Sequence, residues 1–253
     1  MARILVAGES WMTHSVHVKG FDSFATSVYM EGVDNFRTAV EAEGHTVVHQ
    51  PCHIAADHFP ETIDELNQYD VVVLSDIGAN TLLLPARVFE QARIGPNRLE
   101  VLGDWVSAGG GLAMVGGYLS FTGIEAKANY GGTALATVLP VDMSPVDDRQ
   151  EAPEGIQFKL TPTAHPITDG LDREWPPVLG FQRFAAKKGT ETLVIAAEHP
   201  VLVVGRHGAG RVLAFATDIG PHWAPPEFLS WPGFRRLWGN AARWLAGDAV
   251  DAS

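Results

Sequence analysis

Short, uninterrupted hydrophobic runs that alternate with longer amphipathic stretches constrain the fold of this chain most strongly. RILVAG (3–8), HTVVHQ (45–50), DVVVLSD (70–76) and GLAMVGG (111–117) each have the length of a strand. Continuous runs of this kind are typical of parallel strands that are buried on both faces. Because stretches of helical character lie between them, the order predicts an α/β fold with a mostly parallel sheet flanked by helices.

The stretches between these runs carry the signals of helices. A helix is expected around Tyr29–Glu43, ended by Gly44, and another at 60–68, which begins with proline and acidic residues. Residues 97–108 have apolar side chains at helical spacing, and FRRLWGNAARWLAG (234–247) predicts a helix that closes the fold. We interpret the segment after the first strand, ESWMTHSVHVKGFDSF, as a polar and aromatic loop.

The pattern changes between residues 140 and 210. Proline and aspartate are frequent there, and short runs such as IQFKL, ETLVIAAE and PVLVVGR have β character. HPVLVVGRHGAGRVLAFATD predicts a hairpin that turns at Gly208 and Gly210. No composition break resembles a linker. We therefore expect a single domain over residues 1–248, with a β-rich insertion at about 140–210, an antiparallel extension of the sheet and a frayed tail at 249–253.

Composition and charge exclude several classes of partner. The 253 residues are 46% hydrophobic and carry 18 Lys and Arg against 30 Asp and Glu, a formal net charge of −12. Such an acidic chain repels nucleic acids and anionic membranes, so neither is an expected partner. The single cysteine, Cys52, allows no intrachain disulfide, and the apolar run at the N-terminus is too short for a signal peptide. We expect a cytoplasmic protein that forms a homo-oligomer and binds a small molecule.

Polar residues follow the expected strands where a site would lie. In open α/β sheets ligands collect outside the carboxyl ends of the strands. Glu9 follows the first run, Tyr118 follows the fourth, and Asp218 and His222 follow RVLAFAT. We assign His222 as the acid–base residue, oriented by Asp218 or alternatively by Glu227, with Tyr118 and Glu9 assisting. Each could instead be structural, Tyr118 as an aromatic filler and Glu9 as a loop cap.

Further residues around these strand ends are expected to bind substrate. Trp11 and Trp223 could wall a sugar or another flat ligand, although tryptophan more often packs in a core. His14, His17, Lys19 and Asp22 crowd one segment. No cofactor is predicted, but His14, His17 and His222 with Asp22 or Asp218 offer a weak divalent-metal hypothesis. The alternative is a polar segment held by local hydrogen bonds. The expected substrate-binding residues are Trp11, His17, Lys19, Asp22, Asp76, Ile77, Gly78, Asn80, Gly117 and Trp223.

Five stretches in this order give the chain a family resemblance: GESW…HVKGFDSF, LSDIGANTLLLP, GGGLAMVGGYLSFTG, HPITDGL and FATDIGPHW. The chain resembles the class I glutamine amidotransferase-like superfamily, in the branch of uncharacterised members, and more distantly the trehalose-utilisation proteins. The resemblance implies a flavodoxin-like fold. It also implies that the loop after DVVVLSD offers the backbone amides of Ile77 and Gly78 as an oxyanion cradle, although a strand-to-helix turn capped by Asp76 or Asn80 explains that loop equally well.

The chain departs from the family where glutaminase chemistry would occur. Active amidotransferases carry a Gly-x-Cys-x-Gly turn, and the matching residues here are Gly116–Gly117–Tyr118–Leu119–Ser120. Tyrosine stands at the nucleophile position, so we do not expect glutaminase activity. Two hypotheses remain. The first is a hydrolase or lyase that acts on a small carbohydrate-like or amide metabolite. The second is a non-catalytic binding or assembly protein that kept the fold.

Overall fold

An eight-stranded sheet organises the computed structural model, which describes residues 1–247. The strand order is β4-β1-β5-β6-β14-β13-β12-β9, and the first five strands of that order run parallel. The bounds are β4 Thr46–Gln50, β1 Arg3–Gly8, β5 Val71–Ser75, β6 Gly111–Val115, β14 Gly210–Phe215, β13 His199–His207, β12 Glu191–Ala196 and β9 Phe158–Leu160. The predicted α/β fold with a mostly parallel sheet is confirmed.

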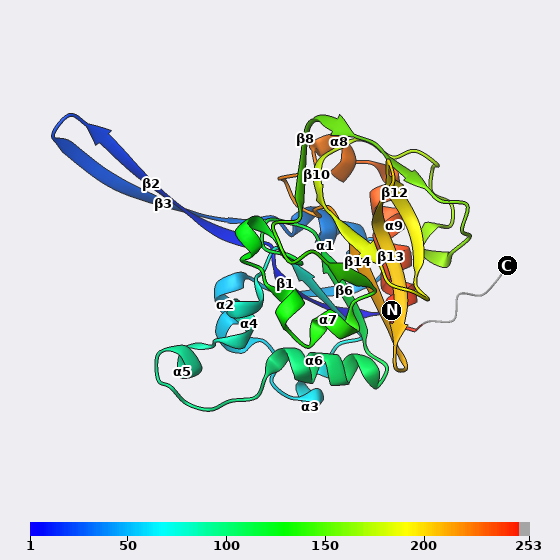
Figure 1. Cartoon of the computed structure of the whole chain (residues 1–253), viewed down its shortest axis with the longest axis horizontal. Coiled ribbons are helices and arrows are strands. Elements are labelled where there is room, and N and C mark those ends of the chain that lie inside the picture. Colours follow the sequence, from blue (N-terminus) through cyan, green and yellow to red (C-terminus); the bar gives the residue numbers. More distant parts are fainter. Residues whose placement is uncertain (248–253) are drawn as a thin grey trace.

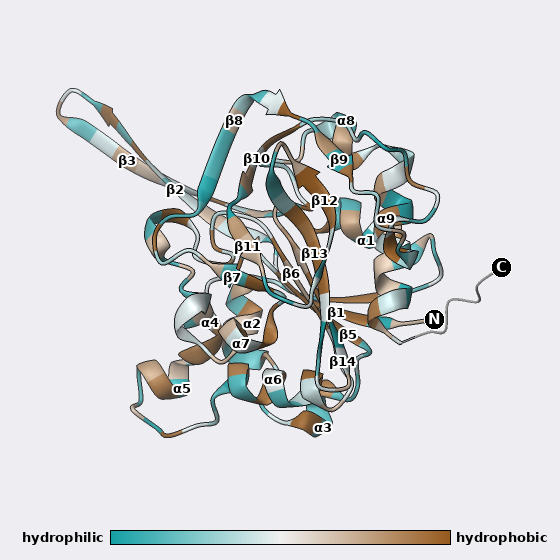
Figure 2. Ribbon diagram, turned by 45° about the vertical axis from the view of Figure 1, so that its right-hand side comes forward, coloured by the Kyte–Doolittle hydropathy of each residue, from teal (hydrophilic) through white to brown (hydrophobic). Residues whose placement is uncertain are grey.

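Helices cover the sheet because its central strands are hydrophobic on both faces (Figure 2). α9 (Pro232–Leu245) packs on β6 and β14 and contacts α1 (Asp34–Glu41). α6 (Arg98–Ser107) packs on β14 and contacts three shorter helices. Those and the remaining short helices are α2 Cys52–His58, α3 Ile63–Leu66, α4 Ala79–Leu83, α5 Ala86–Phe89, α7 Leu135–Val138 and α8 Pro226–Leu229, with 3-10 turns at Ile124–Ala126, Tyr130–Gly132 and Pro166–Thr168.

The register of the parallel strands brings four loop starts together. Gly8 pairs with Ser75, Ser75 with Val115, and Val115 with Phe215. These residues end β1, β5, β6 and β14, so the next residue of each chain segment leaves the sheet at the same edge. Glu9, Asp76, Gly116 and Ala216 therefore begin neighbouring loops at one rim of the sheet, as parallel topology requires.

The segment between 140 and 210 contributes the antiparallel half of the structure. β13, β12 and β9 extend the main sheet, and β13 and β14 form the predicted hairpin with Gly208 at positive φ in its turn. Two small sheets accompany them. In one, β8 (Arg149–Ile156) pairs with β10 (Val178–Gln182), and in the other, β7 (Val141–Met143) pairs with β11 (Phe184–Ala186). The tail expected at 249–253 and residue 248 lie outside the described residues.

A long β-hairpin projects from the body of the molecule (Figure 1). Its strands are β2 (Ser10–Lys19) and β3 (Asp22–Glu31), which we call the arm. This finding corrects two predictions: residues 9–24 are not a loop, and the helix expected around Tyr29–Glu43 begins only at Asp34. The arm has no buried face to give a clean alternation of polar and apolar residues, so its sequence lacks the usual strand signal. The helix expected at 60–68 shrinks to α3, where Thr62 forms a capping box with Glu65.

Candidate functional site

Two strained residues mark the rim at the carboxyl ends of β1 and β5. Glu9 has a φ of 48° and Asp76 a φ of 45°, so each leaves its strand in a left-handed conformation that side-chain-bearing residues rarely adopt. The Glu9 amide donates to the Ser75 carbonyl at 3.0 Å, and the Asp76 amide donates to Ser120 Oγ at 3.0 Å. Such strain persists only where surrounding contacts hold it, and it is concentrated at functional sites.

The Glu9 carboxyl is buried beneath this rim. Ser75 Oγ donates a short hydrogen bond to Glu9 Oε1. Gly32 and Gly220 close over the other oxygen, since a Cβ at either glycine would lie 2.7 Å from Glu9 Oε2. Burial, together with the negative charge of Asp76, raises the pKa of Glu9 from 4.5 to about 8. A pKa near 8 favours the protonated form of Glu9 at neutral pH.

Asp218 lies beside Glu9 and is equally buried. Burial raises the pKa of Asp218 well above its usual range, and the negative charges of Glu9 and Asp76 raise it further. Its Oδ1 accepts from the Gly220 amide at 3.4 Å, whereas Oδ2 makes no hydrogen bond within residues 1–247. Two neighbouring carboxyls that cannot both ionise form a pair that stores a proton.

His222 connects this carboxyl pair to the surface. Its Nδ1 lies 3.8 Å from Asp218 Oδ2, and its side chain is 40% exposed. The separation is longer than a hydrogen bond, so the two groups interact through their charges when His222 is protonated. Burial raises the pKa of Asp76, and the charge of His222 opposes that rise, so Asp76 also lies within its electrostatic reach. The predicted neighbourhood of His222, Asp218 and Glu9 is thus present.

An aromatic stack covers the carboxyls. The His222 ring lies between Trp11, at 5.6 Å, and Tyr118, at 5.0 Å and nearly parallel. Trp223 packs against Tyr118 at 5.7 Å and is itself buried. Trp11 and Tyr118 therefore meet His222 as expected, and Trp223 joins the stack through Tyr118. Trp223 forms an inner wall, whereas Trp11 is half-buried at the root of the arm.

Two residues of the insertion complete the surroundings of Tyr118, and neither was predicted from the sequence. The Arg149 guanidinium lies 4.8 Å from the centre of the Tyr118 ring, and Trp223 Nε1 donates to Glu151 Oε2 at 2.9 Å. Burial raises the pKa of the Tyr118 hydroxyl, and the charge of Glu151 raises it further, so the phenol stays protonated. Arg149 and Glu151 begin β8 in a run of charged residues that carries no strand-end signal.

Asp76, Gly117 and the following turn hold the rim together. Asp76 Oδ1 accepts from the Leu119 amide at 2.7 Å, and a Cβ at Gly117 would lie 2.9 Å from the Asp76 side chain. Gln182 bonds both the amide and the carbonyl of Gly117. Gly117, at a φ of 146°, lets Asp76 approach the turn, and Tyr118 itself does not take a left-handed conformation. Tyr118 therefore lacks the left-handed backbone conformation found at Glu9 and Asp76.

The expected oxyanion cradle lies under another segment. The Ile77 carbonyl accepts from the Tyr130 hydroxyl at 2.6 Å, and the Ala79 amide donates to the Ala128 carbonyl at 2.9 Å. Ile77 and Gly78 are buried beneath residues 127–130, while Asn80 is exposed on α4. Because Ile77 and Gly78 are buried in this way, their amides do not face the candidate site beside His222.

Three predicted binding residues lie on the arm and away from the rim. His17 stacks on Phe24 and contacts Thr26 at 3.2 Å, and Lys19 pairs with Asp22 beside the turn. Seven strand residues separate His17 from the root, roughly 23 Å along the arm. The prediction that His17, Lys19 and Asp22 share one site with His222 is wrong, because the segment extends as a hairpin.

The same geometry separates the residues of the metal hypothesis. His14 bonds Ser27 within the arm at 2.8 Å, three residues beyond the Trp11 that stacks on His222. Among residues 1–247 no group of three or more His, Cys, Asp or Glu side chains is arranged to hold a metal ion. The proposed set of His14, His17 and His222 is therefore not assembled.

Cys52 begins α2 beside the rim. Its Sγ lies 3.8 Å from the Asp76 carbonyl, and its amide donates to Ser10 Oγ at 2.7 Å. Burial raises the pKa of the thiol, which disfavours the thiolate that a nucleophile requires. Cys52 also lines an apolar cavity of about 370 Å³ with Trp11, Met12, Tyr29 and His53 at the root of the arm.

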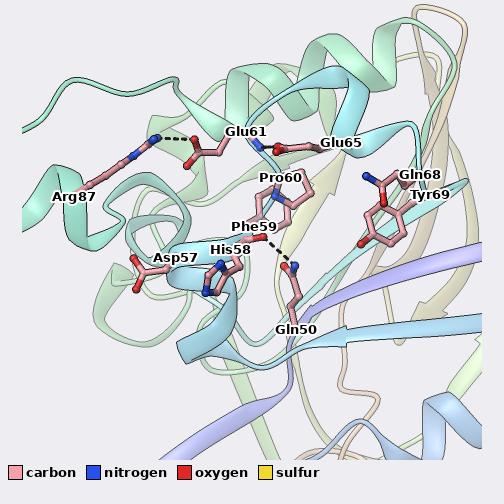
Figure 3. A pocket seen from close by; sticks show the side chains of 10 residues that line it. All are labelled: Gln50, Asp57, His58, Phe59, Pro60, Glu61, Glu65, Gln68, Tyr69 and Arg87. Carbon is pink, nitrogen blue, oxygen red and sulfur yellow. Dashed lines mark hydrogen bonds and ion pairs between the residues drawn. The ribbon is translucent and has the colours of Figure 1, made fainter.

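A second, polar cavity lies apart from these residues (Figure 3). It has a volume of about 420 Å³ and is lined by side chains around α2, α3 and α5. Arg87 crosses it to Glu61 at 2.7 Å, and Gln50 bonds the His58 carbonyl at 3.0 Å. None of the rim carboxyls borders this cavity, which separates it from the candidate site.

Comparison with known proteins identifies the family. The family model GATase1_like, described as "Putative glutamine amidotransferase", matches residues 3–247, so the chain belongs to this family. It is similar to a cytoplasmic protein from Salmonella typhimurium LT2, with 46% identity, 96% of this chain and 99% of that chain covered, and a TM-score of 0.93.

Two further structures extend this likeness. A second Salmonella typhimurium cytoplasmic protein is 44% identical over 96% of this chain and 98% of its own, with a TM-score of 0.92. A ThuA-like protein from Parabacteroides merdae shares the fold at 13% identity, over 96% of this chain and 89% of that chain, with a TM-score of 0.57. The amidotransferase-like fold is confirmed, and the ThuA-like protein shares this fold. A search of curated protein sequences gives no match.

The helices are short compared with the thickness of a bilayer. Within residues 1–247, none of them combines the length and the apolar character that crossing a membrane would require.

Proposed function

We propose that the protein is a hydrolase or lyase that acts on a small polar metabolite, carbohydrate-like or amide in class, at the rim formed by β1, β5, β6 and β14. The observation that carries this proposal is the buried Glu9–Asp218 pair, whose pKa values are raised by burial and whose Asp218 Oδ2 lies 3.8 Å from Nδ1 of the half-exposed His222 ring. A general acid works best when its pKa lies near the working pH, and desolvation is a common means of achieving this.

The surrounding side chains fit such a role. His222 would pass a proton between Asp218 and a substrate atom at the surface, and Asp218 would recover it from Glu9. The Tyr118 hydroxyl, kept protonated beside Arg149, would donate a hydrogen bond to a substrate oxygen. Trp11 would offer an apolar wall to the ring or carbon skeleton. Because the two Salmonella relatives are described as cytoplasmic proteins, we propose a cytoplasmic location for this chain as well.

Glutaminase chemistry is not part of this proposal. Tyrosine occupies the position of the attacking cysteine, and the thiol of Cys52 is held protonated by burial. The same observation favours one alternative, a non-catalytic ligand-binding or assembly protein. In that case the aromatic stack over Glu9 and Asp218 would bind a ligand and release it without chemical change.

The experiment that separates these functions combines binding with product analysis. Wild type, His222→Ala and the control His207→Ala are screened for thermal stabilisation by sugars, keto-sugars and amides, and each hit is incubated and analysed by mass spectrometry. His207 pairs with Gly210 at the opposite end of the sheet. The enzyme proposal predicts a product that His222→Ala abolishes and His207→Ala retains. A ligand bound by wild type and recovered intact would support the binding protein instead.

A further inference from the structure

The arm exposes the kind of surface that soluble proteins usually bury. Half of the large hydrophobic side chains that are exposed within residues 1–247 lie on it, including Phe21 at its tip, Val16, Val18 and Phe24. Every residue of β3 is exposed, and beyond the root no other strand or helix of the described chain packs along the arm (Figure 1). Exposed apolar side chains gathered on one element mark an interaction surface.

An isolated two-stranded hairpin is at best marginally stable in water, because it lacks a core and leaves both edges unpaired. This one has two strands of 10 residues each, which makes it about 33 Å long. A hairpin of this length keeps a fixed shape only when another protein surface packs against it. The arm therefore needs a partner surface to pack on.

The root of the arm offers a complementary feature. The apolar cavity of about 370 Å³ lies there, lined by Trp11, Met12, Tyr29, Cys52 and His53. Phe21 is a projecting aromatic side chain at the tip, in the turn after Gly20. One chain cannot bring its own tip to its own root. Two chains related by a two-fold axis, with their arms antiparallel, bring each tip to the other's root, and this contact closes on itself.

Charge also favours a second copy of this chain, and the area of the arm is compatible with one. A ribbon about 33 Å long and 10 Å wide offers about 330 Å² on the face that a partner arm covers, so the contacts between tip and root must supply the rest of the roughly 800 Å² per partner of a standard interface. Residues 10–31 carry only Lys19, Asp22 and Glu31 as charged side chains, whereas the whole chain has a net charge of −12. Because the arms are nearly uncharged, they can contact each other while the two acidic bodies remain separated.

We propose that two copies of this protein exchange their arms, and that Phe21 of each enters the apolar cavity at the root of the other. The cavity shares Trp11 with the candidate site, and Trp11 stacks on His222. The tip of one chain would therefore line the entrance to the other chain's site. This proposal rests on the arm alone and stands whether or not the rim is catalytic.

A single engineered cysteine tests the contact. Phe21→Cys places a thiol at the tip, and the natural Cys52 lies in the root cavity of the partner. A disulfide requires Cα atoms within about 7 Å, which excludes a bond within one chain whose tip is about 30 Å from its root. Under mild oxidation at micromolar concentration, we expect most of the chain to become a covalent dimer. Phe89→Cys, another exposed phenylalanine, and the double variant Phe21→Cys/Cys52→Ser should crosslink at least about tenfold less.

Sedimentation of the unmodified protein provides a second readout. Wild type and Phe89→Asp should be dimers, and Phe21→Asp should be a monomer whose body still unfolds cooperatively. A wild-type monomer at tens of micromolar would overturn the proposal, and so would a dimer that survives Phe21→Asp while the Phe21→Cys variant forms no disulfide with Cys52. A monomer that binds phosphatidylcholine vesicles through Phe21 would also overturn it, because the arm would then belong to a lipid surface.

Discussion

Two adjoining regions of this molecule invert the usual distribution of side chains in opposite ways. At the rim, Glu9 and Asp218 are buried carboxyls with no Lys or Arg paired to them among the described residues, and the His222 ring lies 3.8 Å from Asp218. One residue after Glu9 begins the arm, where phenylalanine, valine and methionine side chains face water. Burying an unpaired carboxyl and exposing a row of apolar side chains are both costly.

The difference between the two regions lies in how each cost is relieved. At the rim the chain itself supplies the remedy, because protonation neutralises the buried pair and Ser75 bonds Glu9. On the arm nothing within residues 1–247 covers the apolar side chains. The rim is therefore a self-contained chemical site, whereas the arm is one half of a contact. Each interpretation can be tested separately.

The largest expected effect is on turnover. Once a substrate is identified, His222→Ala and Glu9→Gln should each lower kcat by about 10²- to 10⁴-fold, the range for loss of a general acid or base. Cys52→Ser should retain wild-type kcat, because its thiol takes no part. Steady-state kinetics on the three variants measures this. Full activity in His222→Ala would remove the rim from the chemistry.

The pH dependence of stability comes next. A carboxyl whose pKa is raised on folding stabilises the folded state fully below its ordinary pKa of 4.5, and this contribution is lost as the pH rises towards about 8. For Glu9 the slope is about 1.4 kcal/mol of unfolding free energy per pH unit. Glu9→Gln should remove it, and the exposed Glu125→Gln should not. Urea unfolding at pH 5, 6.5 and 8 checks this, and equal slopes in Glu9→Gln and wild type would contradict it.

Crowding the buried carboxyl should cost somewhat less. A Cβ at Gly220 would lie 2.7 Å from Glu9 Oε2, so Gly220→Ala should destabilise the fold by about 1–3 kcal/mol. Gly131 has no heavy atom within 4 Å of such a Cβ, and Gly131→Ala is the matched control. Thermal unfolding measures both. Equal melting temperatures would show that Glu9 is not enclosed as described.

The smallest effect concerns Arg149. Arg149→Met removes the cation above the Tyr118 ring, a contact worth about 0.5–1 kcal/mol, while keeping much of the side-chain volume. Arg149 also pairs with Asp147 at 3.0 Å and with Glu151 at 3.3 Å, so the loss of unfolding free energy adds these partly exposed ion pairs, about 0–1 kcal/mol each, to the ring contact. Any substrate whose oxygen binds beside Tyr118 should show a raised KM. An unchanged KM would separate Arg149 from the site.

The sequence predicted the sheet better than the site around it. Runs such as ILVA and VVVL are hydrophobic at every position, so both their strand state and their parallel packing follow from composition. The order of the strands then predicts which residues lie at the rim, because parallel strands end at one edge of the sheet. These residues are Glu9, Asp76, Tyr118 and His222. His17, Lys19 and Asp22 could not be placed in this way, since a hairpin without a buried face has no distinguishing period. Arg149 and Glu151 reach the rim only through the fold of the insertion.

The protonation state of Glu9 and Asp218 tests the central claim most directly. Infrared difference spectra of wild type against Glu9→Gln, recorded across pH 5–9, report the carbonyl stretch of a protonated carboxyl. We predict that the difference spectrum contains the band of protonated Glu9 at pH 7 and that this band is lost as the pH passes about 8. Two ionised carboxylates at pH 7 would contradict the account, because the rim would then hold no proton to transfer.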